Sequence, residues 1–333
     1  MTFSNHDLAG QRMMVGFEGT EPNDRLKQIV ENLKVAGIIL FSCNIQSPDQ
    51  LRELCAYAQG CARRAGLPPL FIAVDQEGGS VARLREPWTR FPGASQMNNE
   101  TAIADFTATT AAELTDAGIN MNMAPVLDIA PAGIQSVMAD RSFGPDPDRV
   151  AELGAAVIEG FQQRHLMAVA KHFPGIGRTE LDSHLDLPVL DIDLPSLRRS
   201  DLIPFHAAVR QGVAGMMLSH IFYRRIDPDW PASLSTVISR DLLREELGYR
   251  GLVLTDDLDM GAIEKHYGIQ TVADRILQAD IDLALICHEG PNIEAAHQYF
   301  CRQIADSAEF RRRSEISIQR IQATKKRFGL TDS

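Results

Sequence analysis

One pattern recurs eight times along the chain and limits the folds it can adopt: a short apolar run ends in glycine or polar residues, and a helical stretch follows. The runs do not alternate between apolar and polar positions, which is typical of strands buried on both faces of a parallel sheet. Eight strand–helix units predict a single α/β domain, a (β/α)8 TIM-type barrel with room for one irregular or distorted strand. The runs lie at 13–17, 37–41, 70–74, 122–127, 167–170, 215–218, 251–254 and 283–286.

The length of 333 residues fits one large barrel, which we expect to span 1–333 and to carry a helical tail at about 290–333. A doubly wound open sheet is the alternative, but EGTEPND follows the first run where that fold favours a GxGxxG phosphate turn. Two helix starts are expected at N-capping residues, Asp201 and Ser239. Gly212 and Gly248 suit the ends of these two helices.

The net charge of −11 disfavours nucleic-acid and membrane-surface partners, because an acidic surface repels phosphate groups. No apolar run approaches the roughly 20 residues of a membrane-spanning helix, and the N-terminus lacks a secretory pattern. The five cysteines match no zinc-binding spacing. We therefore expect a cytoplasmic protein with reduced thiols, either a monomer or a weak homo-oligomer.

Ionisable residues follow six of the eight runs. In such barrels the ends of the strands meet at one face, where active sites are built. Several charges desolvated at one face are costly unless they serve a purpose, so the pattern predicts an active site. The residues are Asp75 to Glu77, Asp128, Lys171 with His172, Ser219 with His220, Asp256 with Asp257, and His288 with Glu289.

Three chemistries compete for this face. A metal-dependent hydrolase would draw on His172, His220, His288 and Asp256, but the first run carries no His-x-His pair. A phosphate-binding barrel favours a glycine-rich loop late in the chain, which CHEGPN resembles poorly. A glycosidase needs a carboxylate and a proton donor across the scissile bond, and Asp256 suits the first of these roles.

The segment 171–188, KHFPGIGRTELDSHLDLP, is rich in glycine and proline and predicts a loop that can reach over the barrel mouth. Asp182 and His184 are two residues apart, so the carboxylate can orient the imidazole and raise its pKa. Such a histidine is a competent general acid and base near neutral pH. The plainer alternative is that Asp182 caps a turn and His184 faces solvent.

This loop resembles the signature of the family-three glycoside hydrolases, whose bacterial β-N-acetylglucosaminidases carry a similar KHFPG…T…DSH…LP. Further similar motifs, in the family's order, are AGIILFSCNI, AVDQEGGSVARL, GINMNMAPVLDI, DRSFG, PASLS and LVLTDDLDM. The resemblance implies a single barrel domain and retaining hydrolysis through a covalent glycosyl-enzyme intermediate. It implies Asp256 as the nucleophile, His184 as the acid/base and Asp182 as the orienting partner of His184.

The same resemblance implies five substrate-binding residues: Asp75, Arg83, Arg141, Lys171 and His172. Asp128 is interpreted as a brace of the barrel mouth, and His220 and His288 as supports of the site. We expect neither a metal nor a cofactor, and an N-acetylglucosaminide from cell-wall fragments as the carbohydrate substrate of an exo-acting enzyme. The alternatives are a β-glucosidase type, a phosphorolytic enzyme and a catalytically weak sugar-binding protein.

The chain departs from the family pattern at Ile176 and Arg178, where GIGR replaces the usual GHGD. This change alters the packing and charge of the loop and puts substrate preference or rate in doubt. Arg178 has two interpretations. It either pairs with an anionic aglycone or forms a surface ion pair with Glu180 or Asp186.

Overall fold

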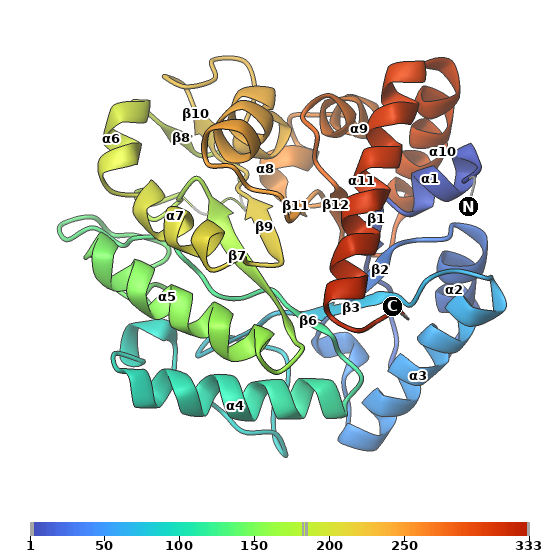
Figure 1. Cartoon of the computed structure of the whole chain (residues 1–333), viewed down its shortest axis with the longest axis horizontal. Coiled ribbons are helices and arrows are strands. Elements are labelled where there is room, and N and C mark those ends of the chain that lie inside the picture. The colour runs from blue at the N-terminus through green and yellow to red at the C-terminus, as the bar shows by residue number, and fades with distance from the viewer. Residues whose placement is uncertain (1–2, 182, 184–185, 332–333) are drawn as a thin grey trace.

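The computed structural model describes residues 3–181, 183 and 186–331, which form a closed barrel of eight parallel strands surrounded by helices (Figure 1). The strands follow one another around the barrel in chain order, and the last closes against the first. The predicted (β/α)8 barrel is confirmed. Its strands are β1 (Met13–Val15), β2 (Gly37–Leu40), β3 (Phe71–Val74), β6 (Met121–Asn122), β7 (Met167–Phe173), β9 (Gly215–Leu218), β11 (Leu252–Asp257) and β12 (Leu283–Ile286).

Helices connect the strands on the outside of the barrel, and none in the described part of the chain is long and apolar enough to cross a membrane. They are α1 (Asn5–Gly10), α2 (Asp24–Lys27) continued by η1 (Gln28–Asn32), α3 (Pro48–Arg64), α4 (Glu100–Asp116), α5 (Pro147–Gln162), α6 (Leu194–Arg199), α7 (Leu202–Arg210), η5 (Val237–Glu246), α8 (Gly261–Glu264), α9 (Ile269–Gln278), α10 (Pro291–Asp306) and α11 (Ala308–Arg327).

Short elements occupy the loops that follow the barrel strands. The strands β4 and β5 form an antiparallel pair after β3, and β8 pairs in parallel with β10. These elements add ordered backbone around the barrel mouth, where the candidate site lies. They are β4 (Gln76–Gly78), β5 (Val81–Ala82), β8 (Val189–Leu190), β10 (Phe222–Tyr223), η2 (Ser42–Asn44), η3 (Ala94–Gln96) and η4 (Ala232–Leu234).

The fourth barrel strand is the irregular one. The run predicted at 122–127 is a strand only at its start, in β6, and then makes an isolated bridge between Val126 and Lys171. Pro125 interrupts it because proline has no N–H to donate to a neighbouring strand. The side chain of Asn122 supplies part of the missing pairing: its amide accepts from the backbone N–H of Gln76 and donates to the Gln76 carbonyl, each at 3.0 Å.

The helix start expected at Asp201 is confirmed and the one expected at Ser239 is wrong, and both predicted helix ends are right. Asp201 stands at the start of α7, but its carboxylate makes no capping bond and accepts hydrogen bonds from Arg178. Ser239 lies inside η5, which begins two residues earlier at Val237. Gly212 and Gly248 follow the ends of α7 and η5 with φ of 69° and 72°, the left-handed conformation that glycine adopts at low cost.

The barrel interior is filled by side chains, so it is a packed core and not a pore. Buried residues from all eight strands form this interior cluster, and Ile321 and Phe328 from the C-terminal segment close it from below. A larger apolar layer packs between the strands and the helices. The interior residues include Met14, Phe71, Met121, Met167, Val169, Met217, Leu254 and Leu285.

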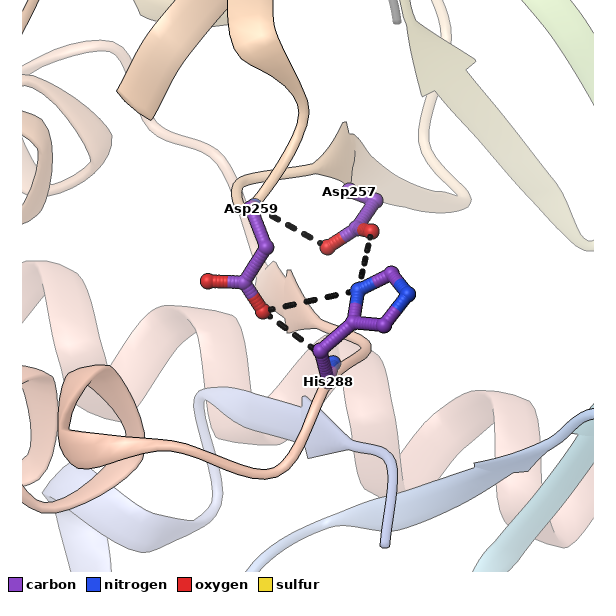
Figure 2. Close-up of side chains that lie close together, drawn as sticks. All are labelled: Asp257, Asp259 and His288. Atoms are coloured by element: carbon purple, nitrogen blue, oxygen red, sulfur yellow. Dashed lines mark hydrogen bonds and ion pairs between the residues drawn. The ribbon is translucent and has the colours of Figure 1, made fainter. Parts of the chain in front are cut away.

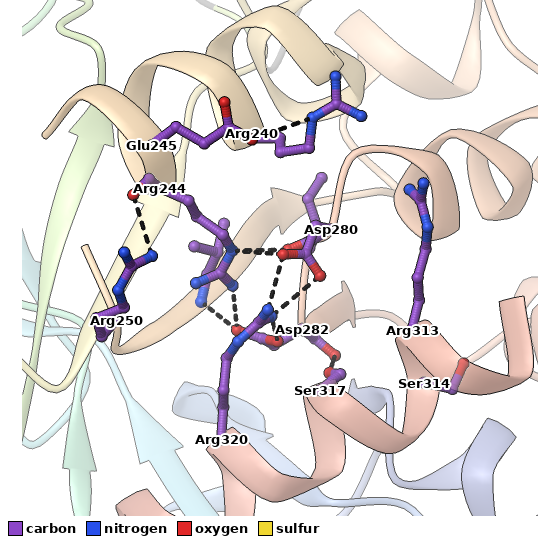
Figure 3. Close-up of polar contacts among 12 residues, drawn as sticks. Arg240, Arg244, Glu245, Arg250, Asp280, Asp282, Arg313, Ser314, Ser317 and Arg320 are labelled. Atoms are coloured by element: carbon purple, nitrogen blue, oxygen red, sulfur yellow. Dashed lines mark hydrogen bonds and ion pairs between the residues drawn. The ribbon is translucent and has the colours of Figure 1, made fainter. Parts of the chain in front are cut away.

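The floor of the barrel, where the strands begin, is tied to α11 by ion pairs (Figure 3). Asp282, fully buried just before β12, accepts from Arg244 Nη2 of η5 at 2.6 Å and from Arg320 Nη1 of α11 at 2.8 Å. Arg320 also donates to Asp280 at 2.7 Å. The network therefore joins α11 to two other parts of the chain.

Lys325 of α11 is fully buried in the same floor. Its ammonium nitrogen lies 3.2 Å from the carbonyl oxygen of Ala36 and 4.7 Å from the centre of the Phe71 ring. Burial lowers the pKa of Lys325 to about 7, because the charged form loses its hydration. The floor thus holds one lysine whose charge is only weakly compensated.

Candidate active site

A cavity of about 580 Å³ opens at the ends of the barrel strands. Six of the predicted site residues line it: Asp75, Arg83, Arg141, Lys171, His172 and Asp256. They come from β3 and its following hairpin, the loop after β6, and strands β7 and β11. The structure therefore brings together residues that lie up to 181 positions apart in the sequence.

Lys171 is the centre of a buried charge cluster on one wall of this cavity. Its ammonium group lies 2.8 Å from Asp75 and 2.6 Å from Glu77. Arg141 donates two hydrogen bonds to Glu77, at 2.8 and 2.7 Å, and Arg83 contacts Asp75 at 3.3 Å. Three cations therefore surround two carboxylates, so each buried carboxylate has the partners that a buried ion requires.

Burial alone would raise the pKa of Asp75, but Lys171 and Arg83 outweigh it and bring the value to about 2. The pKa of Glu77 is likewise lowered against its burial, by Lys171 and Arg141. Both groups are therefore anionic at neutral pH, and Asp75, which lines the cavity, can accept hydrogen bonds from a ligand. Glu77 was not among the predicted site residues, although it follows the third run together with Asp75.

Asp128 orients His172, a role beyond the bracing that the sequence predicted. It is fully buried, and its Oδ2 lies 2.7 Å from Nδ1 of His172. Its other oxygen accepts from the backbone N–H of Ile176 at 2.8 Å. One carboxylate thus fixes the ring of His172 and the start of the loop that follows.

Asp256 and Asp257 stand side by side at the end of β11 and have different surroundings. Within the described residues, the Asp256 side chain accepts a hydrogen bond from the backbone N–H of Asp257, at 2.8 Å. Asp257 instead accepts from the backbone N–H groups of Cys287 and Asp259, at 3.0 and 3.1 Å. Asp257 is held by the neighbouring strand end, which leaves Asp256 as the carboxylate available to a ligand.

Asp257, Asp259 and His288 form a cluster beside the cavity (Figure 2). Their potential ligand atoms all lie within 4.8 Å of one another. Nδ1 of His288 lies 3.3 Å from Asp257 and 3.9 Å from Asp259, and the bond to Asp257 is the main cause that raises the pKa of His288. The three side chains therefore contact one another, and a cation bound among them would compete with His288 for the two carboxylates.

His220 supports the same strand end from the other side. Its Nε2 lies 2.8 Å from the carbonyl oxygen of Asp257, and its Nδ1 lies 2.6 Å from Ser233 Oγ. Burial lowers the pKa of His220, which favours the neutral ring. A neutral ring in these contacts steadies the backbone that carries Asp256.

The sequence model of the protein family described as the glycosyl hydrolase family 3 N-terminal domain matches residues 7–324 of this chain. The chain belongs to glycoside hydrolase family 3. It is 37% identical over 292 residues to a β-hexosaminidase of Alkalilimnicola ehrlichii, covering 85% of this chain and 82% of that protein. A β-hexosaminidase of Pseudomonas aeruginosa is 36% identical over 288 residues, which is 85% of this chain and 84% of that relative.

Solved structures of family 3 enzymes share the fold over nearly the whole chain. The β-N-acetylglucosaminidase from Paenibacillus sp. matches with a TM-score of 0.94 and 35% identity over 100% of this chain, which spans 64% of that structure. NagZ from Neisseria gonorrhoeae, solved with N-trifluoroacetyl-D-glucosamine, matches with a TM-score of 0.75 and 28% identity, over 93% of this chain and 98% of that one. The chain is therefore a glycoside hydrolase.

The loop after β7, which carries the family 3 signature, is anchored firmly where it leaves the barrel. Tyr223 donates to the carbonyl of Gly175 at 2.8 Å. A side chain at Gly177 would collide with the carbonyl oxygen of Ile129, so the backbone there needs glycine. Farther along, the backbone N–H of Ala262 donates to the carbonyl of Ser183 at 3.1 Å, which links the loop to α8.

Arg178 does not pair with Glu180 or Asp186 as the plainer interpretation expected. Its Nε donates to both oxygens of Asp201, at 3.1 and 3.0 Å, and its Nη2 donates to Ser200 Oγ at 2.9 Å. Asp186 lies instead 2.6 Å from Nε2 of His266. Because the guanidinium is engaged by a buried carboxylate, the geometry favours a structural role for Arg178 over recognition of an anionic aglycone.

Two of the predicted catalytic residues, Asp182 and His184, lie outside the described residues. Their roles as acid/base and orienting partner therefore stay predictions. Their neighbour Ser183 is described and largely buried. The substrate-binding roles of the cavity residues also stay predictions, although the cavity brings those residues together.

Proposed function

We propose that this family 3 enzyme is a retaining exo-β-N-acetylglucosaminidase that acts on cell-wall fragments. The observation that carries the proposal is the placement of Asp256 in a cavity opposite the cluster of Asp75, Lys171 and Arg83. A pyranose needs groups of this kind: charged acceptors and donors for its hydroxyls, and a carboxylate near its anomeric carbon. The related β-hexosaminidases and the N-acylglucosamine bound to the Neisseria NagZ support the choice of sugar.

In this proposal Asp256 attacks the anomeric carbon while His184, oriented by Asp182, protonates the departing oxygen. Water then attacks the glycosyl-enzyme, and His184 takes its proton, so that Asp256 is released unchanged. Asp75, Arg83, Arg141, Lys171 and His172 hold the sugar. Nε of Arg83 is buried and has no hydrogen-bond partner among the described residues, which suits a donor reserved for a ligand.

The nucleophile is tested by trapping. A slow 2-fluoro N-acetylglucosaminide should inactivate the enzyme and leave one covalent adduct, which peptide mapping should place on Asp256. An adduct on Asp257 would move the nucleophile by one residue. An inactive protein that forms no adduct with any aryl glycoside would favour the sugar-binding alternative.

The sugar and the acceptor are tested together with a panel of nitrophenyl glycosides, each assayed with and without phosphate. The N-acetylglucosaminide should be cleaved at least about 100-fold faster than the glucoside, because a polar site rejects a ligand that leaves its groups unpaired. Formation of a sugar 1-phosphate would indicate phosphorolysis. A preference for the glucoside would reject the proposed sugar.

The acid role of His184 is tested through the leaving group. His184→Ala should slow the cleavage of a natural disaccharide far more than that of a dinitrophenyl glycoside, because dinitrophenolate departs without protonation. Equal losses on both substrates would remove His184 from this role.

A further inference from the structure

A second cavity, of about 570 Å³, lies at the barrel floor, at the opposite end from Asp256. It is bounded by α11 and by the segments that lead into β9 and β11, at Val213 and Gly251. The catalytic chemistry makes no use of it. Three arginines line it: Arg250, Arg320 and Arg327.

The charge around this cavity is unbalanced. Behind it, the carboxylates of Asp280 and Asp282 face the guanidiniums of Arg244 and Arg320 (Figure 3). The guanidinium of Arg12 also interacts electrostatically with both carboxylates. Arg12 is almost completely buried, and its Nε has no hydrogen-bond partner in the described part of the chain. Burial lowers the pKa of Arg12 to about 10, which shows how incompletely its charge is compensated.

Arg250 and Arg327 add further positive charge on the open side. Both are exposed, and neither contacts a carboxylate in the part of the chain that the structure describes. Five arginines thus stand against two aspartates in a protein whose net charge is −11. Such a local excess of positive charge attracts anions, and it does so most strongly in a concave site.

Several carbonyl groups at this cavity already have hydrogen-bond donors, and among the described residues Arg250 uses only its Nη1 on a carbonyl, that of Arg244 at 3.3 Å. The carbonyl of Gly212 accepts from Gln162 at 3.1 Å, and that of Val213 accepts from Tyr249 at 3.1 Å. The carbonyl of Gly251 accepts from Arg244 at 3.2 Å. A Cβ placed at Gly248 would meet nothing within 4 Å, so the approach to the cavity is open there.

We infer that the floor cavity binds an anion through a phosphate group held by Arg250 and Arg327, beside Arg320, whose terminal nitrogens are bonded to Asp280 and Asp282. Guanidinium groups suit phosphate because they donate two parallel hydrogen bonds to its oxygens. The cavity is much larger than one phosphate, so the structure favours a phosphorylated sugar over the inorganic ion. Bound there, the ligand links α11 to the segments before β9 and β11 and stabilises the floor.

The test is calorimetric titration of the full chain with inorganic phosphate and with glucose 6-phosphate, at constant ionic strength and with N-acetylglucosamine saturating the mouth. Arg250→Ala and Arg327→Ala should each weaken binding about tenfold, the loss expected for one charged hydrogen-bonding partner. Arg302→Ala, which removes an exposed arginine of α10, is the matched control and should leave the affinity unchanged.

Tighter binding of glucose 6-phosphate than of phosphate supports a phosphorylated sugar, and equal binding supports the inorganic ion alone. Either ligand should also raise the melting temperature of the wild-type protein and not that of the Arg250→Ala, Arg327→Ala double variant. The inference is wrong if neither ligand binds, if the double variant binds as tightly as wild type, or if potassium chloride produces the same heat. Because the readout is binding, failure here leaves the proposed hydrolysis untouched.

Discussion

The two ends of the barrel both concentrate buried charge, and they use it differently. At the mouth, Lys171 and Asp75 pair beside an open cavity of about 580 Å³, so their remaining hydrogen-bonding capacity faces a ligand. At the floor, the two oxygens of Asp282 accept hydrogen bonds from Arg244 and Arg320, and these bonds fasten α11 to the strands. We therefore expect ion pairs of the same chemistry to take part in recognition at the mouth, whereas at the floor they hold the fold together.

This difference predicts that substitutions at the mouth affect turnover and substitutions at the floor affect stability. The largest effect is expected for Asp256→Asn, which should lower kcat/KM by a factor of about 1,000 or more, because the amide cannot form the glycosyl-enzyme. The melting temperature should change little, since Asp256 holds few of its neighbours. An active Asp256→Asn enzyme, measured free of wild-type contamination, would contradict the prediction that substitutions at the mouth affect turnover.

Asp282→Ala should give the largest effect at the floor. It removes the fully buried partner of Arg244 and Arg320 and leaves both arginines to Asp280 alone, and breaking a buried pair costs about 3–5 kcal/mol of unfolding free energy. Urea denaturation measures the loss, and Asp105→Ala on the exposed side of α4 is the control. The remaining folded enzyme should keep its kcat/KM within about twofold. A large loss of turnover without a loss of stability would contradict the division of roles.

A smaller effect is expected for Asp128→Asn at the mouth. The substitution keeps the size of the side chain but weakens the charged bonds to His172 and Ile176, which are worth about 1.5–3 kcal/mol each. We expect kcat/KM to fall about 30- to 100-fold. Steady-state kinetics together with thermal melting should show the loss in turnover exceeding the loss in stability. A loss in stability that exceeds the loss in turnover would mean that Asp128 has a structural role like that of Asp282 at the floor.

How much of the fold and of the candidate site could be predicted from the sequence depends on how far apart the interacting residues lie in the chain. All eight strands followed from their apolar runs, because a strand buried on both faces must be apolar throughout. Asp75, Lys171, His172 and Asp256 followed from their places at the strand ends, whereas Arg83 and Arg141 followed from the family resemblance alone. Asp201, by contrast, was expected to cap its own helix, whereas its carboxylate binds Arg178, 23 positions away. Local patterns do not reveal such a partner, since either bond satisfies the same carboxylate.

The network of ion pairs around Asp280 and Asp282 at the floor could not be predicted from the sequence for the same reason. Its members come from residues as distant as Arg12 and Arg320, and none belongs to a motif. The shortened fourth strand had a local sign, Pro125, whose missing N–H ends the regular pairing. Glu77 and Asp128 stood at predicted strand ends, but their contacts with Arg141 and His172 depend on the curvature of the barrel.

The smallest expected effect is a gain, at Lys325. Because burial lowers its folded-state pKa to about 7, the unfolded chain binds more protons between about pH 7 and pH 10.5, and this lysine makes stability rise with pH across that window. Lys325→Met should therefore raise the unfolding free energy by about 1 kcal/mol at pH 7 and by less at pH 10. Urea denaturation at both values measures this. A gain that grows with pH would mean that Lys325 is charged in the folded protein.

The close approach of Gly177 to Ile129 divides the signature loop into a fixed part and an exchangeable part. Any other residue at 177 would push the backbone away from the barrel, so evolution and protein engineering share the same constraint there. Loop grafts or randomised libraries that aim to change the aglycone preference should keep residues 171–178 together with Asp182 and His184, and vary the remaining positions beyond 178. New specificities would then arise in a loop whose first residues keep their position against the barrel.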